Sequence, residues 1–212
     1  LFFPSVLNDP NLIISNFFIL LAFRRIISLQ SLKFPKEKIF DASLWVFVAA
    51  LFHFWSILFI ILIFSAIIFH TARDYRNWFL PFIAFFTVGV LFILFALIFD
   101  KSLIAGVLEN SITSFEIKYF VNNYQNLALS IFVSVALFFL ASLALTWSHR
   151  ALMLHSSYNK IALYFLTGIA VFLISPNKSN DILLFTFAPL AIIATIHIEF
   201  PQERMQREYV LG

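Results

Sequence analysis

Residues 42–69 form a run of 28 residues without one charged side chain. Further apolar runs lie at residues 12–29, 79–99, 127–147, 161–174 and 182–198. A helix that crosses a bilayer needs roughly 20 predominantly apolar residues. The spacing of these runs therefore predicts an all-α protein, a polytopic helical integral membrane protein.

The overall composition supports this fold class. Hydrophobic residues make up 62% of the chain and charged residues 12%, whereas a soluble domain carries about 25% charged residues. Intrinsic disorder is excluded because it requires low hydrophobicity and high net charge. The absence of cysteine excludes disulfides and thiolate metal sites, and four widely spaced glycines exclude a phosphate-binding glycine loop.

Apolar residues lie at both ends of the chain. Residue 1 is not methionine, and residues 1–7 are mostly apolar, as the tail of a helix would be. We expect residues 1–212 to form a single transmembrane domain, truncated at its N-terminus, and we expect a further helix after the C-terminal residues.

The run at 42–69 has two interpretations. As one tilted helix it would reach about 42 Å and would place His53 and Trp55 near the bilayer centre. As two short helices that turn at residues 52–55, it would place both side chains at an interface. Trp prefers interfaces, and an ionisable residue inside the membrane is costly.

The distribution of Lys and Arg favours the pair of helices. A single span would divide these residues eight to six between the two sides of the membrane, and the pair would divide them eleven to three. Positive charge collects on the cytoplasmic side. We therefore predict that residues 33–38 and 73–76 both lie there. The opposite side then carries residues 8–9, His53, the segment 100–126 and residues 176–181. A surface-lying amphipathic helix is expected within 100–126.

Asp9 and His53 are the candidate catalytic residues of that outward side. Asp9 could serve as a carboxylate at a membrane-edge pocket that acts on a lipid-linked substrate. It is also placed to cap a helix that begins at Pro10, and capping is the commoner role of such a residue. Glu109, Glu116 and Lys118 allow acid–base chemistry, but a solvated face is the favoured interpretation.

The basic residues near helix ends predict contacts with lipid headgroups. These candidates are Arg24, Arg25, Arg73 and Arg76. No metal site is predicted, because no two histidines are four residues apart and the paired topology separates them. The five histidines are His53, His70, His149, His155 and His197. Lys160 is assigned to the loop before residue 161, so no charge is expected in the middle of a span, which argues against an ion-coupled transporter.

Several segments carry a family resemblance. The segments are Phe3-Pro4-Ser5-Val6-Leu7-Asn8-Asp9-Pro10, residues 16–25, residues 38–45 and Arg73-Asp74-Tyr75-Arg76-Asn77-Trp78. They resemble an uncharacterised family of polytopic inner-membrane proteins from Bacteroidota. The arrangement of outward loops with an Asp, between helices that end in basic residues, is similar to that of membrane glycosyltransferases of the C superfamily. That resemblance implies sugar transfer from a polyprenyl-phosphate carrier, with Asp9 matching a secondary acidic position and His53 the nearest match for the residue that holds the carrier phosphate.

These observations lead to two functional hypotheses. The first is a multi-pass protein of the bacterial inner membrane and cell envelope that is related to enzymes handling lipid-linked sugars. The second is a non-catalytic membrane subunit of a larger envelope assembly, such as a secretion or motility machine. We expect membrane lipids and other membrane protein chains as partners, and neither nucleic acid nor a cofactor. An outward cavity between the Asp9 turn, the His53 turn and segment 100–126 would favour the first hypothesis.

Overall fold

The computed structural model describes residues 9–71, 74–109, 123–146, 152–176 and 179–211. These residues form eight α-helices and no strand, so the all-α prediction is confirmed. The α-helices are α1 (Pro10–Ser28), α2 (Pro35–Phe52), α3 (Ile60–His70), α4 (Arg76–Phe99), α5 (Ser102–Glu109), α6 (Asn123–Thr146), α7 (Leu152–Ile174) and α8 (Leu184–Leu211). Three short 3-10 helices are η2 (Leu29–Ser31), η3 (Phe54–Phe59) and η6 (Asn180–Leu183).

Five helical segments within the described residues are long and apolar enough to cross a membrane. They are Pro10–Ser31, Arg76–Phe99, Asn123–Ala144, Ser156–Ile174 and Asn180–His197. Phe54–His70 is a shorter apolar segment. The chain is therefore a polytopic helical membrane protein.

The run at 42–69 is split, as the charge distribution predicts. Helix α2 ends at Phe52, His53 has an extended backbone, and the chain continues through η3 into α3. Lys36 at the start of α2 forms a 3.2 Å ion pair with Asp74 after α3, so the two outer ends of the pair lie together. Helix α2 starts at Pro35 rather than near Ala42, and its 18 residues reach about 27 Å.

Two serines hold the break in the helix pair. Ser15 of α1 donates a hydrogen bond to the carbonyl of Ala49 at 3.0 Å and shares a 2.8 Å hydrogen bond with Ser56 of η3. Both serine side chains are fully buried. A non-helical backbone inside a membrane protein must have its polar groups satisfied by other protein groups. Ser15 supplies one such partner at the point where α2 ends.

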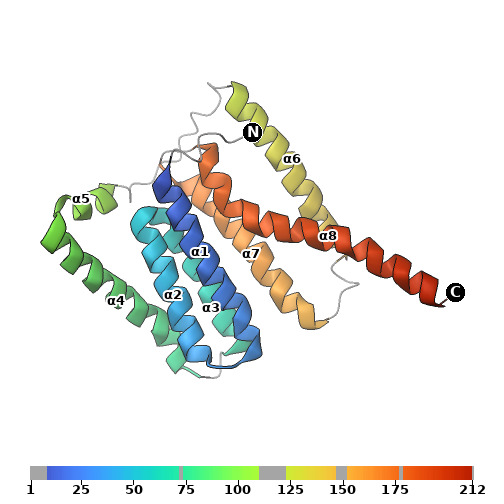
Figure 1. Cartoon of the computed structure of the whole chain (residues 1–212), viewed down its shortest axis with the longest axis horizontal. Helices are drawn as coiled ribbons and strands as arrows, with labels where there is room; N and C mark the ends of the chain where they lie inside the picture. Colours follow the sequence, from blue (N-terminus) through green and yellow to red (C-terminus); the bar gives the residue numbers. More distant parts are fainter. Residues whose placement is uncertain (1–8, 72–73, 110–122, 147–151, 177–178, 212) are drawn as a thin grey trace.

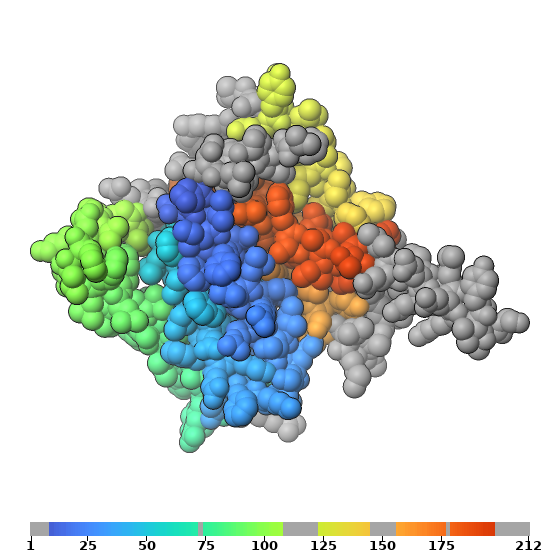
Figure 2. Space-filling model, in the orientation of Figure 1, coloured from blue at the N-terminus to red at the C-terminus, as the bar shows by residue number. Residues whose placement is uncertain are grey.

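The helices pack around a main apolar core, with two smaller apolar clusters beside it. Figure 1 shows α1, α2 and α3 side by side, with α4 on one flank and α7 and α8 on the other. Figure 2 shows the blue surface of α1 in the middle of this face, between green α4 and orange α8. Aromatic rings fill the centre, where the ring of Tyr164 on α7 contacts those of Phe23 and Phe59.

The structure corrects two further boundaries. Helix α7 begins at Leu152, nine residues before the predicted start, so the assignment of Lys160 to a loop is wrong. Lys160 lies inside α7 and its side chain is 1% exposed. Helix α8 continues to Leu211, beyond the predicted end at Ile198. Helix α5 occupies the start of segment 100–126, and residues 110–122 of that segment lie outside the described residues.

Gly168 allows α7 to approach the start of α8 closely. A Cβ atom at this position would lie 2.7 Å from Cγ2 of Thr186 and 3.4 Å from the carbonyl carbon of Phe185. Both neighbours are fully buried, and the hydroxyl of Thr186 is held by the carbonyl of Leu183 at 2.6 Å. An added Cβ would therefore press on a buried side chain that is already held by a hydrogen bond.

We expect Gly168→Ala to destabilise the protein by about 1–3 kcal/mol, the usual cost of overpacking. The matched control is Gly89→Ala on α4, where an added Cβ meets nothing within 4 Å and the higher helix propensity of alanine gains up to about 1 kcal/mol. Thermal unfolding of the purified proteins in detergent measures both. Equal melting temperatures for the two variants would contradict the close approach at Gly168.

Candidate functional site

Asp9 caps the first helix. Its Oδ1 accepts hydrogen bonds from the backbone N–H groups of Asn11 at 3.1 Å and Leu12 at 3.3 Å, and Pro10 occupies the first helical turn. The capping role predicted from the sequence is therefore confirmed. Because one carboxylate oxygen satisfies both N–H groups, the second oxygen, Oδ2, has no hydrogen-bond partner among the described residues.

His53 lies where α2 ends. Its backbone N–H donates to the carbonyl of Ala49 at 3.0 Å, and its own carbonyl accepts from the N–H of Ser56 at 2.9 Å. The imidazole ring lies 5.7 Å from the ring of Phe185, between centroids. Its Nε2 is buried and has no hydrogen-bond partner among the described residues. His53 thus closes the turn and keeps an unused polar atom.

The structure brings Asp9 and His53 to one polar cavity. The cavity has a volume of about 150 Å³ and lies where α1 begins, α2 ends and η6 begins. Its lining consists of Asp9, Asn11, Leu12, Phe52, His53, Phe54, Pro176, Ser179 and Ile182. The carboxylate, the imidazole, an amide and a hydroxyl therefore surround one small space, which we call the polar pocket.

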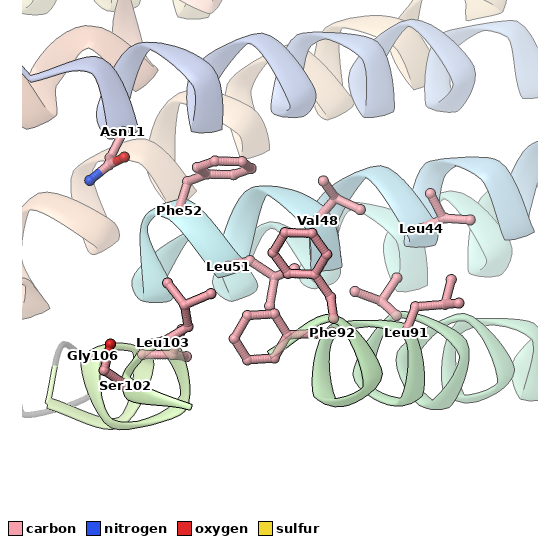
Figure 3. Close-up of a pocket in the computed structure, with 13 residues that line it drawn as sticks. Asn11, Leu44, Val48, Leu51, Phe52, Leu91, Phe92, Ser102, Leu103 and Gly106 are labelled. Atoms are coloured by element: carbon pink, nitrogen blue, oxygen red, sulfur yellow. The ribbon is translucent and has the colours of Figure 1, made fainter. Parts of the chain in front are cut away.

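A larger apolar groove adjoins the polar pocket. It has a volume of about 650 Å³ and lies between α2, α4 and α5. Its lining consists of Asn11, Leu44, Val48, Leu51, Phe52, Val88, Leu91, Phe92, Phe95, Ser102, Leu103, Gly106 and Val107. Figure 3 shows the apolar side chains along α2 and α4, with Asn11 and Ser102 at the same end on opposite sides of the groove. Asn11 and Phe52 line both spaces, so the polar pocket lies beside the polar end of the groove.

Helix α5 closes this end of the groove. Asp100 caps it by accepting hydrogen bonds from the N–H of Ser102 at 2.8 Å and from its hydroxyl at 2.7 Å. These two bonds lower the pKa of the Asp100 carboxyl below its ordinary value. At Gly106 the helix presents no side chain, and a Cβ there would meet nothing within 4 Å. The missing side chain leaves room in the groove.

The predicted headgroup-binding residues that the structure describes lie away from this pocket. Arg25 forms a 3.1 Å ion pair with Asp41, and the guanidinium of Arg76 lies 6.0 Å from the ring centroid of Tyr75. Arg24 is exposed, and Arg73 lies outside the described residues. At the same end, the backbone N–H of Arg76 and the ammonium of Lys36 lower the pKa of the Asp74 carboxyl.

Lys160 is a charged residue that sequence reasoning missed. Its ammonium donates a hydrogen bond to the carbonyl of Ile26, near the C-terminus of α1, at 3.4 Å. No carboxylate lies within ion-pair distance of it among the described residues. Each predicted span ends at the nearest charged residue, so this rule assigns Lys160 to a loop. Nothing in the spacing of the apolar residues shows that the helix continues past it.

The histidines occupy separate places. His53 lines the polar pocket, His70 hydrogen-bonds with the hydroxyl of Ser156 at 3.1 Å, and His197 contacts the hydroxyl of Ser142. The side chains of His149 and His155 lie outside the described residues. Within the described part of the chain, no three His, Asp or Glu residues form a group that could hold a metal ion.

Comparisons of the chain with protein-family models, with curated proteins and with solved structures found no match.

Proposed function

We propose that this protein binds a lipid-linked sugar in the envelope membrane of a bacterium, as enzymes that handle such lipids do. The observation that carries the proposal is that the polar pocket and the apolar groove lie next to each other, with Asn11 and Phe52 in the lining of both. An amphipathic lipid has the same two parts in the same order. Its chain would lie in the groove and its head in the polar pocket.

The dimensions of the two spaces support this match. Binding sites for small molecules usually have volumes of about 300–1,000 Å³ and a largely apolar lining with a few polar groups. The groove alone falls within that range, and the polar pocket alone is smaller. Neither space is a complete site for a sugar-bearing lipid, whereas the two together provide for both of its ends.

The distribution of basic residues supports an outward orientation of the polar pocket. Arg24, Arg25, Lys33, Lys36, Lys38 and Arg76 all lie toward the end where α1 finishes and α4 begins. Positive charge favours the cytoplasmic side, so the polar pocket would face the opposite leaflet of a bacterial inner membrane. In this orientation Arg24, Arg25, Arg73 and Arg76 would contact lipid headgroups of the cytoplasmic leaflet.

The alternative function is a non-catalytic subunit of a larger envelope assembly. Helix α4 favours it, because its outer face exposes large apolar side chains such as Phe79, Phe86 and Ile98. Another membrane protein chain would cover that face, but lipid chains cover such a face equally well. A subunit of this kind has no need of a polar pocket joined to a groove, so lipid binding is the better-supported function.

Photolabelling of the whole chain in nanodiscs tests the proposal. The probe is an alkyl glucoside with a photoactivatable diazirine in its chain. We expect the label on groove-lining residues of α2, α4 and α5. Gly106→Leu fills part of the groove and should reduce labelling about tenfold, because two methylenes expelled from the groove cost roughly 0.8 kcal/mol each.

Gly89→Leu is the matched control. It adds the same side chain to a helical glycine with open space around it, and Gly89 does not line the groove. Its labelling should equal that of the unmodified protein. Unchanged labelling of Gly106→Leu, or label confined to the outer face of α4, would rule out the groove as the lipid site.

A further inference from the structure

We propose that the turn between α1 and α2, residues 32–34, binds an anionic phospholipid of the leaflet at the basic end of the protein. Leu32 and Phe34 enter the acyl chains, and the ammonium of Lys33 between them contacts the phosphate of the headgroup. This inference goes beyond the proposed function and does not rest on it, because it requires only that the chain spans a membrane.

The first observation is the backbone of the turn. Leu32 and Phe34 have φ angles of 53° and 50°, in the left-handed region. That region is unfavourable for residues with a Cβ atom, and bulky side chains rarely adopt it. Phe34 also precedes Pro35, and a proline restricts the backbone of the residue before it. Glycine at either position would avoid this cost, so the strain indicates a role for the apolar side chains themselves.

The second observation is the exposure of the two side chains. Leu32 is 57% exposed and Phe34 is 72% exposed. Each is a large apolar side chain whose removal from water is favourable, yet the folded chain covers less than half of its surface. The free energy of burying the rest must come from a second molecule that covers the turn.

Hydrogen bonds hold the turn in this conformation. The backbone N–H of Leu32 donates to the carbonyl of Leu29 at 3.0 Å. The ammonium of Lys38 donates to the carbonyl of Ser28 and to the hydroxyl of Ser31, both at 2.7 Å. Lys38 on α2 therefore ties the end of α1 to the start of α2. A turn fixed in this way loses little conformational entropy when another molecule binds it.

The position of the turn relative to the bilayer favours a lipid as this molecule. The span Pro10–Ser31 ends directly before Leu32, and its 22 residues reach about 33 Å, close to the hydrocarbon thickness of about 30 Å. Residues 79–99 of α4 are free of charge, and the ion pair of Lys36 with Asp74 lies beyond the start of this stretch. Both helices place the turn in the headgroup layer, next to the acyl chains.

The charge around the turn favours an anionic lipid. Residues 24–41 contain five basic side chains and two acidic ones, and the acidic Asp41 is already paired with Arg25. Lys33 is exposed and has no ion-pair partner among the described residues. A basic residue near an anionic membrane surface strengthens binding. A zwitterionic lipid carries a cation beside its phosphate and therefore gains less from Lys33.

Photocrosslinking from position 34 tests the proposal. Benzoylphenylalanine replaces Phe34 in the full chain, which is reconstituted into nanodiscs of phosphatidylcholine with a minor fraction of phosphatidylglycerol. We expect phosphatidylglycerol adducts about fivefold above the share of this lipid in the bilayer, because one basic residue near an anionic surface contributes about 1 kcal/mol. Adducts in proportion to the bilayer composition, or the absence of lipid adducts, would overturn the proposal.

Lys33→Gln tests the contact with the phosphate. This variant should bring the phosphatidylglycerol adducts down to the share of that lipid in the bilayer. The matched control is Lys101→Gln, which removes the same charge from an exposed lysine directly before α5, at the opposite end of α4, and should leave the excess unchanged. An excess that survives Lys33→Gln would show that Lys33 does not bind the headgroup.

Leu32→Asn tests the apolar contact in a chain that keeps its fold. Asparagine tolerates the left-handed backbone better than leucine does, so the melting temperature in detergent should stay the same or rise. The yield of lipid adducts from position 34 should fall at least twofold, because one of the two apolar anchors is lost. A higher melting temperature with an unchanged yield would show that Leu32 strains the turn without binding lipid.

Crosslinking in intact cells distinguishes a lipid from a protein at the turn. We expect phospholipid adducts there too, and a protein adduct in their place would overturn the proposal in favour of a docking site for that protein. Gly106→Leu, which changes the groove at the other end of α4, should leave the adducts from position 34 unaltered. Failure of the lipid site in the groove and failure of the lipid site at the turn are therefore separate results.

Discussion

Lys160→Glu should prevent the protein from accumulating in a folded form, whereas Lys160→Met should leave it folded and at least as stable as the unmodified chain. The Lys160 side chain is 1% exposed and its ammonium donates to the carbonyl of Ile26. A glutamate there would bury a carboxylate against a carbonyl oxygen, near the negative end of the α1 dipole.

The expected size of this effect follows from the cost of burying an unpaired charge. That cost is about 3–5 kcal/mol, a large part of the 5–15 kcal/mol that stabilises a typical domain. Methionine fills a similar volume without charge, and replacing buried ionic groups by apolar ones is often neutral or stabilising. The carbonyl of Ile26 is not orphaned by this change, because it also accepts from the N–H of Leu29.

Yield of monodisperse protein and its melting temperature in detergent measure the two variants. Lys36→Glu is the control, since Lys36 is a half-exposed lysine whose ion pair with Asp74 is worth at most about 1 kcal/mol at a surface. If Lys160→Glu folds and melts like Lys160→Met, then water or another charge stabilises an ionised group at position 160, and an unpaired charge there does not limit the stability of the fold.

The pairing of helices at 42–69 could be predicted from the sequence because it depends on charge and on membrane thickness. The basic residues on either side of the run indicate which ends lie on the cytoplasmic side. Trp55 in the middle of the run favours an interface, and therefore a turn at that point. The start of α2 at Pro35 could not be read in this way. Helix α2 extends beyond the apolar run and includes charged residues such as Lys36 and Asp41. Their ion pairs with Asp74 and Arg25, which are visible only in the structure, hold them in the folded protein.

The candidate site was predictable in part for a related reason. Asp9 followed by Pro10 is a local capping signal, and His53 lies beside Trp55 in the middle of the run, where both side chains favour an interface and therefore a turn. The apolar groove has no local signal, because it arises from the placement of α4 and α5 against α2. Gly106 leaves room in the groove, but nothing in the sequence around it indicates that space.

The orientation of the protein in the membrane gives the second large effect. We expect single cysteines at positions 33 and 75 to be labelled only from the cytoplasmic side, and a cysteine at position 124 only from the opposite side. The chain contains no cysteine, so each variant carries one thiol. Lys33 is exposed, and the side chains of Tyr75 and Tyr124 are 68% and 85% exposed, so each thiol should be accessible.

The structure fixes which of these positions share an end. The ion pair between Lys36 and Asp74 joins the segments that contain residues 33 and 75. At the other end, the amide of Asn180 in η6 donates to the carbonyl of Gln125 at 3.1 Å, so the start of α6 lies beside the polar pocket. Labelling therefore reports directly which side of the membrane the polar pocket faces.

A membrane-impermeant maleimide applied to intact spheroplasts and to inverted vesicles makes the measurement. Residue 124 should react in spheroplasts, and residues 33 and 75 in inverted vesicles only, because the basic end is held on the cytoplasmic side. Reaction of 33 and 75 from opposite sides would be incompatible with the paired helices. Reaction of both in spheroplasts, with 124 protected, would turn the polar pocket toward the cytoplasm, and the sugar lipid would then have to be bound from the inner leaflet.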